Sequence, residues 1–103
     1  MNRETRKQLK QLTEKLTSLN QEFEQFKENL EEIMGDVESI RDEEQDKYDN
    51  MPESIQQGEK GDTMQEGIDS LDDLYSQIED TISSLDDVAS SLCDLESHEA
   101  FYL

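Results

Sequence analysis

The chain has 103 residues, of which 31% are hydrophobic, so it is long enough for one small domain but not for a thick globular core. Its 28 Asp and Glu residues outnumber nine Lys and Arg residues and give a formal net charge of −19. This balance excludes direct binding to nucleic acid, where Lys and Arg must contact the phosphates, and it disfavours anionic membrane surfaces. Long-range attraction instead favours basic proteins as partners.

The first predicted element is a long helix over residues 3–46. Its apolar residues follow one another at alternating steps of three and four, which is typical of a coiled-coil seam. This predicted seam consists of Leu9, Leu12, Leu16, Leu19, Phe23, Phe26, Leu30, Ile33, Val37 and Ile40. The next two positions are Glu44 and Lys47, which indicates that the helix ends near residue 46.

A joint is expected over residues 47–62. It contains four residues that favour turns or helix ends, namely Asn50, Pro52, Gly58 and Gly61. Pro52 suits the first turn of a short helix. Thr63 and Glu66 have the spacing of a capping box, which predicts a second long helix over residues 63–97.

The second helix has a seam of its own and a further apolar stripe beside it. The seam consists of Met64, Ile68, Leu71, Tyr75, Ile78, Ile82, Leu85, Ala89 and Leu92. The stripe consists of Leu74, Val88 and Leu95, which are separated by multiples of seven residues. A helix with such a wide apolar surface is expected to contact more than one neighbour.

These elements predict an all-α protein, an antiparallel two-helix coiled-coil hairpin that forms a single domain over residues 1–103. The charges agree, because an antiparallel pairing places the basic residues near the N-terminus beside the acidic residues near Glu96. Two helices alone bury little surface, so we expect the hairpin to dimerise into a four-helix bundle. Leu74, Val88 and Leu95 are the expected contacts between the two chains.

Acidic residues recur with a period of seven along the second helix. This acidic row consists of Asp72, Asp73, Glu79, Asp80, Asp86, Asp87 and Asp94, and no Lys or Arg follows Lys60. The row is either a solvated face or a surface that meets a basic groove. We expect Lys15 and its neighbours to neutralise it near Asp86, which leaves the carboxylates around Asp72 freest to bind.

The sequence contains no signature of an enzyme. His98 is the only histidine, and no glycine-rich phosphate loop or Cys/His cluster is present, so we expect no cofactor and no metal. An EF-hand-like spacing does occur at Asp42, Glu44, Asp46 and Glu53. However, Lys47 stands where the calcium loop needs glycine and Pro52 stands one residue before its last ligand, so coincidence explains the spacing better.

The location expected from the sequence is the cytoplasm. Cys93 is the only cysteine and has no partner for an internal disulfide, which fits a reducing compartment. No apolar run approaches a membrane span, and the first residues lack the apolar core of a signal peptide. The tail over residues 98–103 ends in Phe101, Tyr102 and Leu103, which either pack on the bundle or form a short exposed ligand.

The joint contains the most distinctive motif in the chain, a DN-x-PE-x-x-Q turn followed by Leu-acid-acid repeats. Its residues are Asp49, Asn50, Pro52, Glu53, Gln56 and Glu59. Over residues 42–90 the chain resembles a group of small acidic coiled-coil proteins of bacteriophages and bacterial mobile elements. This resemblance implies an origin in such an element, and a bacterial host cell as the setting, but no activity.

The sequence supports two functions of different kinds. Spread over a hairpin of ~50 Å, the net charge amounts to one per ~2.6 Å, near the one per ~1.7 Å of duplex DNA. The first hypothesis is therefore an inhibitor that mimics nucleic acid and blocks the basic groove of a nuclease or another nucleic-acid-binding defence protein. The second is a structural or assembly adaptor that acts through coiled-coil contacts, with the acidic row as a solvated face.

Overall fold

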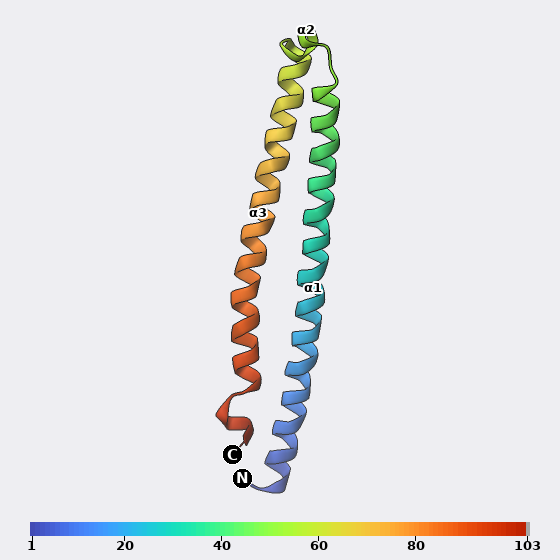
Figure 1. The fold of residues 1–103 in the computed structure, drawn as a ribbon. Coiled ribbons are helices and arrows are strands. Elements are labelled where there is room, and N and C mark those ends of the chain that lie inside the picture. Colours follow the sequence, from blue (N-terminus) through green and yellow to red (C-terminus); the bar gives the residue numbers. More distant parts are fainter. Residues whose placement is uncertain (103) are drawn as a thin grey trace. The chain divides into compact units, whose positions relative to one another are not determined.

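The computed structural model describes residues 1–102, which form four helical elements and no strand (Figure 1). They are α1 (Arg3–Asp49), α2 (Glu53–Gln56), α3 (Glu59–Glu96) and the short 3-10 helix η1 (Glu99–Tyr102). The all-α class predicted from the heptad pattern is confirmed. Both long helices extend further into the predicted joint than the sequence indicates.

The chain divides into two compact units, and the single domain expected from the sequence stays a prediction. Unit 1 comprises Met1–Asn29 and Ile82–Leu103, and unit 2 comprises Leu30–Thr81. Within each unit a segment of α1 lies beside a segment of α3 and runs in the opposite direction (Figure 1). The chain reverses in unit 2, at α2.

α1 begins at a polar cap and ends at a second one. At its start, Asn2 Oδ1 accepts a hydrogen bond of 2.8 Å from the backbone N–H of Thr5, so one of the unpaired donors of the first turn is satisfied. At its end, Asn50 Nδ2 donates to the Asp46 carbonyl over 2.9 Å. This contact satisfies a carbonyl of the last turn and explains why the helix continues to Asp49 instead of ending at residue 46.

α3 begins at Glu59, four residues before the predicted start, and the capping-box prediction is wrong. The Thr63 hydroxyl donates to the Glu59 carbonyl, which is the bond of a residue inside a helix, not of its cap. The Gly58 carbonyl accepts the first intrahelical bond, from Asp62 N–H over 3.1 Å. Glu59 and Asp62 also stabilise this first turn, because negative charge is favourable at a helix N-terminus.

Gly61 allows the joint to pack closely against α3. Gly61 is buried, and a Cβ at this position would overlap the backbone of Gln56 at the end of α2. No side chain larger than hydrogen therefore fits there. The same Gln56 is held from the other side, because its Nε2 donates to the Tyr48 carbonyl over 2.7 Å.

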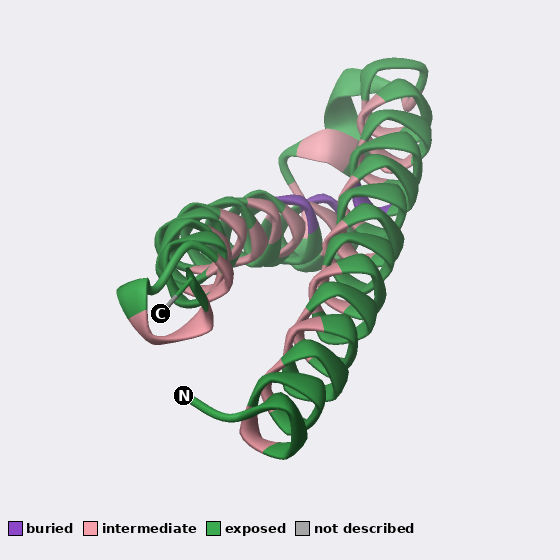
Figure 2. Cartoon of the chain, turned by 90° about the horizontal axis from the view of Figure 1, so that it is seen from below, coloured by how far each residue is buried: buried purple, intermediate pink, exposed green. Residues whose placement is uncertain are grey.

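The surface that α1 turns toward α3 differs from the predicted seam, and half of that prediction is wrong. Five of the ten predicted residues are about half exposed: Leu12 48%, Leu19 52%, Phe26 58%, Ile33 51% and Ile40 51%. The positions that are less exposed instead are the residues immediately after them: Thr13, Asn20, Lys27, Met34 and Arg41. The apolar surface of α1 is broad, and α3 packs against one edge of it. The other edge therefore stays exposed. The seam predicted for α3 is half-buried or buried throughout (Figure 2).

The apolar core is thin and lies in unit 2. Val37 and Ile68 are the buried hydrophobic residues within residues 1–102, at 7% and 1% exposure. Unit 1 has no fully buried side chain among its described residues. In unit 1 the side-chain contacts between the helices are therefore formed by half-buried residues such as Leu16, Phe23 and Leu85.

Candidate protein-binding surfaces

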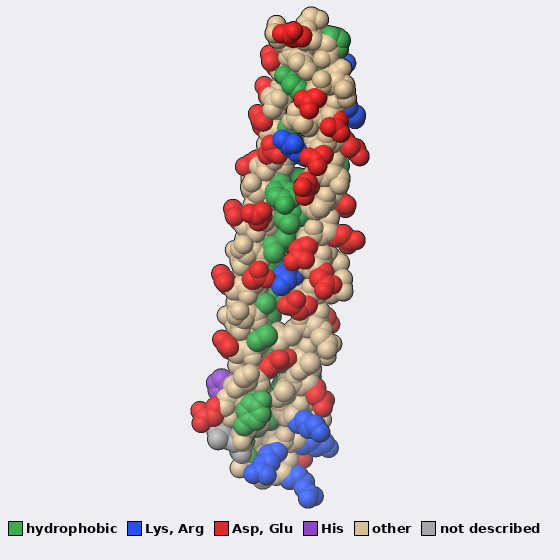
Figure 3. All heavy atoms as spheres, viewed as in Figure 1, with side chains coloured by type: hydrophobic (Ala, Val, Ile, Leu, Met, Phe, Trp, Pro, Cys, Tyr) green, Lys and Arg blue, Asp and Glu red, His purple; other side chains and the backbone are tan. Residues whose placement is uncertain are grey.

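The acidic row lies on the surface of α3, and all seven of its side chains are exposed. Three of them, Asp72, Glu79 and Asp86, follow a seam residue directly and lie nearest to α1. The other four are one residue further round the helix: Asp73, Asp80, Asp87 and Asp94. Figure 3 shows Asp and Glu side chains along both helices of each unit.

Two members of the acidic row form ion pairs with α1, one in each unit. In unit 2, Arg41 Nε donates to Asp72 Oδ1 over 2.8 Å. In unit 1, Lys27 Nζ donates to Asp86 Oδ1 over 2.8 Å and lies 3.6 Å from Glu24 Oε2. The hydrogen bond from each cation to its aspartate raises the pKa of Lys27 and of Arg41.

These ion pairs differ from the pairing expected from the sequence. Lys27, not Lys15, neutralises Asp86, and Asp72, expected to be among the freest carboxylates, has a cation partner. The sequence does contain a signal that reveals the pairs. Lys27 and Arg41 are fourteen residues apart, as are Asp72 and Asp86, so both pairs repeat at the same heptad positions.

Three carboxylates of the row have no partner among residues 1–102. Glu79, Asp87 and Asp94 form no ion pair and no side-chain hydrogen bond with the described residues. Asp73 accepts a hydrogen bond of 2.8 Å from Gln77 Nε2, a neighbour on the same helix. The positions best placed to meet a cation from outside are therefore Glu79, Asp87 and Asp94.

Charge is distributed unevenly between the two units. Unit 2 contains 18 acidic and three basic side chains, a formal charge of −15, whereas unit 1 contains ten and six, a formal charge of −4. In unit 1, Lys and Arg side chains gather at the end that carries the N-terminus (Figure 3). None of the basic residues of residues 1–15 forms an ion pair with a described residue.

Both long helices carry exposed apolar residues beside the seam. On α3 these are the predicted oligomer contacts, with Leu74 44%, Val88 46% and Leu95 48% exposed. On α1 they are the five residues that the sequence placed in the seam, Leu12, Leu19, Phe26, Ile33 and Ile40. We call these eight residues the apolar stripe. The sequence pattern predicted the exposed apolar residues of α3, but it did not reveal that α1 has an equivalent set.

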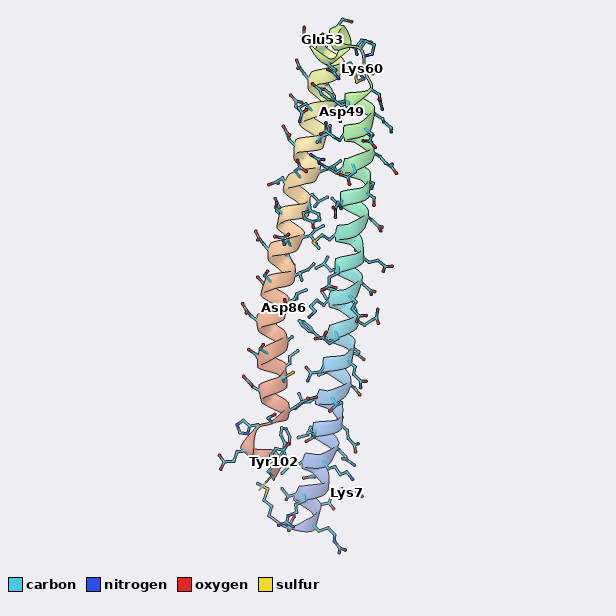
Figure 4. The ribbon with its side chains drawn as sticks, viewed as in Figure 1. Lys7, Asp49, Glu53, Lys60, Asp86 and Tyr102 are labelled. Carbon is cyan, nitrogen blue, oxygen red and sulfur yellow. The ribbon has the colours of Figure 1, made fainter. Side chains whose placement is uncertain are left out.

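The residues of the joint motif have structural roles in unit 2. Asp49 ends α1, Asn50 caps its last turn, and Pro52 precedes α2, where its carbonyl accepts the N–H of Ile55 over 2.9 Å. Glu53 begins α2 and accepts a hydrogen bond from the Gln57 side chain. Gln56 donates to the Tyr48 carbonyl, and Glu59 begins α3. Figure 4 shows Asp49 at the end of α1 and Glu53 at the reversal. The motif thus builds the turn.

The EF-hand-like spacing does not form a loop. Asp42, Glu44 and Asp46 lie inside α1, and Glu53 begins α2. Lys47 Nζ lies 3.0 Å from Glu44 Oε1, which raises the pKa of this lysine. No group of three or more His, Cys, Asp or Glu side chains within residues 1–102 is placed to hold a metal ion. Over the same residues, no helix is both long and apolar enough to cross a membrane.

The C-terminal tail contacts α1 within unit 1. Phe101 is half-buried and lines a shallow depression with Arg6 and Leu9. Tyr102 lines the same depression but remains 77% exposed (Figure 4). The sequence left open whether the tail packs on the helices or is exposed. Phe101 packs against α1, whereas Tyr102 is exposed. Leu103, the third residue of that prediction, lies outside the described residues.

Comparison with known proteins identifies no relative of this chain. No protein-family model matches it, and no curated protein or solved structure does so either. The two surfaces that bear on its function are the acidic row and the apolar stripe.

Proposed function

We propose that the protein is an acidic binding protein that mimics nucleic acid and blocks a basic groove of a host nuclease or another nucleic-acid-binding defence protein. The observation that supports this most is the acidic row of α3. All of its side chains are exposed, and three of them have no partner among the described residues.

The distribution of charge supports the same proposal. Unit 2 concentrates a formal charge of −15 in 52 residues. Its three basic side chains are Arg41, Lys47 and Lys60, and the first two form ion pairs with carboxylates of the same unit. A surface with such an excess of carboxylates attracts a basic groove over a long range, and the attraction weakens as salt is added.

The proposed setting follows from the resemblance to small acidic proteins of bacteriophages and mobile elements. A phage protein that acts on host enzymes works in the bacterial cytoplasm, where nucleases and other defence proteins that carry basic grooves are found. We also propose that the units form one antiparallel hairpin and that the hairpin acts as a homodimer.

The second candidate function is a structural or assembly adaptor. The apolar stripe supports it, because a regular set of half-exposed large side chains offers a coiled-coil contact to another protein. In that case the acidic row only keeps the protein soluble. The two functions differ in how their binding responds to salt and to DNA.

The proposal is tested by retaining bacterial proteins on the immobilised full chain and then eluting with short duplex DNA. If the protein mimics nucleic acid, DNA releases the retained proteins and moderate salt does the same. Retained proteins that neither DNA nor salt releases would support the adaptor function instead and exclude mimicry.

A pair of variants with equal charge distinguishes the acidic row from net charge. One replaces the three unpartnered carboxylates, Glu79→Gln, Asp87→Asn and Asp94→Asn. The matched control removes three exposed carboxylates of α1, Glu14→Gln, Glu28→Gln and Glu32→Gln. The first variant should bind the retained proteins at least ~10-fold more weakly, while the control keeps most of its affinity. Equal losses of affinity in both variants would mean that net charge, and not the acidic row, determines binding.

A further inference from the structure

We propose that the apolar stripe is covered by a second copy of this chain in a head-to-tail arrangement, with unit 1 of one copy against unit 2 of the other. This inference does not depend on the acidic row binding a partner. It identifies which residues form the dimer contact and how the two copies are oriented.

The two parts of the apolar stripe lie on one side of each unit. Successive residues of an α-helix are rotated by about 100°. Phe26 and Lys27 therefore flank the seam residue Phe23 on opposite sides, and Val88 and Asp86 likewise flank Leu85. Because Lys27 contacts Asp86 over 2.8 Å on one side of the seam, Phe26 and Val88 lie on the other side.

Unit 2 repeats this geometry. Arg41 contacts Asp72 over 2.8 Å, and the residue before Arg41 is Ile40. Leu74 is two residues after Asp72, on the opposite side of the seam residue Leu71. Ile40 and Leu74 therefore face the same way, away from the ion pair. Each unit has an apolar side and an opposite side on which carboxylates and their cation partners are found.

The residues beside the apolar stripe differ between the two helices. Residues three or four positions from a stripe residue lie next to it on the surface of a helix. On α3 these are Ser70, Gln77, Ser84 and Ser91, which carry no charge. On α1 they are Lys15, Glu22, Asn29, Asp36 and Glu43, with the cation in unit 1 and two of the three carboxylates in unit 2. The flank of α3 therefore adds no charge to this side, and the flank of α1 changes sign between the units.

The chain leaves enough surface exposed for such a contact. The chain exposes 7674 Å². A folded monomer of this mass exposes roughly 6,000 Å², so the excess is about 1,700 Å². A stable interface buries about 800 Å² on each partner, which this excess more than covers. Unit 1, which has no fully buried side chain among its described residues, has the most to gain from a partner.

The orientation of the two copies follows from the charges of the two units. Pairing like units would place the −15 of one unit 2 against the −15 of the other. In the head-to-tail arrangement each unit 2 meets a unit 1, whose charge is −4. The first fifteen residues of that unit hold five basic and two acidic side chains, and the basic ones have no ion pair with the described residues. Charge complementarity therefore favours the head-to-tail dimer.

The dimer is tested by measuring the mass of the full chain by sedimentation equilibrium. The parent should be a dimer, and the variant with Phe26→Gln and Ile33→Gln should dissociate at least ~100-fold more readily, because each dimer loses four large apolar contacts. Replacing Leu74, Val88 and Leu95 with Gln should have a similar effect. Ile55→Gln, at an apolar residue that is 41% exposed and outside the stripe, is the matched control and should stay dimeric. A monomeric parent, or a variant with unchanged mass, would overturn the proposal.

The orientation is tested by cross-linking in a background with Cys93→Ser. Ser70→Cys and Ser91→Cys both lie beside the stripe of α3 and are 21 residues apart, or ~32 Å along a helix. A short cross-linker should join the two variants when they are mixed, but not two copies of Ser70→Cys. Cross-linking of like copies without the mixed product would show a parallel dimer and overturn the orientation. Circular dichroism of each variant verifies that its helices remain intact.

Discussion

Arg41 Nε donates to Asp72 Oδ1 over 2.8 Å, and this hydrogen bond joins α1 to α3 in unit 2. The Lys27 to Asp86 pair repeats it in unit 1, fourteen residues earlier in α1 and fourteen residues later in α3. The two ion pairs are two heptads apart in each helix, so both specify the same register of α1 against α3. A shift of one heptad would leave both cations without these partners.

The first prediction concerns this register. The charge reversal Asp72→Arg should lower the melting temperature, because it places two arginines together beside the seam of unit 2. The second reversal, Arg41→Asp, should restore most of the loss when it is added to the first. Melting curves of the parent, both single variants and the double variant give the coupling between the two positions. Additive losses in the double variant would show that the pair does not contribute to the register.

The second prediction concerns alkaline pH. The hydrogen bond to Asp86 raises the pKa of Lys27 above its ordinary value of 10.5. A raised pKa in the folded state means that the contribution of Lys27 is fully present below pH 10.5 and is lost as pH rises through the raised value. Unfolding curves below and above this range should show a larger loss of stability for the parent than for Lys27→Gln. Parallel losses in the two proteins would argue that the pair contributes nothing.

The third prediction tests which face of α1 packs against α3. Leu30 is half-buried in the seam, whereas Ile33 belongs to the apolar stripe and is 51% exposed. Leu30→Asp should lower the free energy of unfolding by about 3 kcal/mol or more, since it places a charge among apolar side chains. Ile33→Asp should leave the helices formed and weaken association only. Circular dichroism and sedimentation of both variants separate these effects, and the same loss of helix in both would contradict the assignment.

Much of the helical structure follows from the sequence, because heptad spacing is a local property. The seam of α3 was found correctly because apolar residues, such as Leu71 and Tyr75, occupy both of the heptad positions that pack. α1 is different: Leu9 and its heptad equivalents are flanked on one side by Leu12 and on the other by Thr13. Hydrophobicity favours Leu12 as the packed residue, yet Thr13 is the less exposed of the two. Where the apolar surface of a helix is wider than the area that a neighbouring helix covers, the sequence pattern does not say which edge packs.

The joint and the ion pairs show a second limit. The start of α3 depends on Gly58 and Gly61, because α2 approaches the helix too closely for a side chain at Gly61. That approach is a tertiary contact, which a capping pattern does not contain. Likewise, Lys27 and Arg41 were not recognised as partners of the acidic row, although their spacing of fourteen residues equals that of Asp72 and Asp86.

The fourth prediction concerns the two kinds of glycine in the long helices. Gly61→Ala should destabilise unit 2 by about 1–3 kcal/mol, because its Cβ would overlap the backbone of Gln56 and displace α2. Gly35 in α1 is the matched control, since nothing lies within 4 Å of a Cβ built there. Gly35→Ala should stabilise the chain by about 0.5–1 kcal/mol through the higher helix propensity of alanine. Urea denaturation at one protein concentration measures both, and a stabilising Gly61→Ala would disprove the close approach.

The last prediction concerns two buried polar atoms of unit 1. Asn20 Nδ2 and Glu96 Oε1 have no hydrogen-bond partner, although both residues line the same depression. An unsatisfied buried donor costs about 1–3 kcal/mol, so Asn20→Leu should stabilise the chain by removing the donor and adding apolar contact to the seam. Thr13→Leu is the control, because Thr13 also faces α3 but its hydroxyl already donates to the Leu9 carbonyl over 3.1 Å. Both variants gain apolar surface, and only the first loses an unsatisfied donor, so Asn20→Leu should give the larger rise in the free energy of unfolding. A smaller rise than that of Thr13→Leu would mean that the Asn20 amide is already hydrogen-bonded in solution.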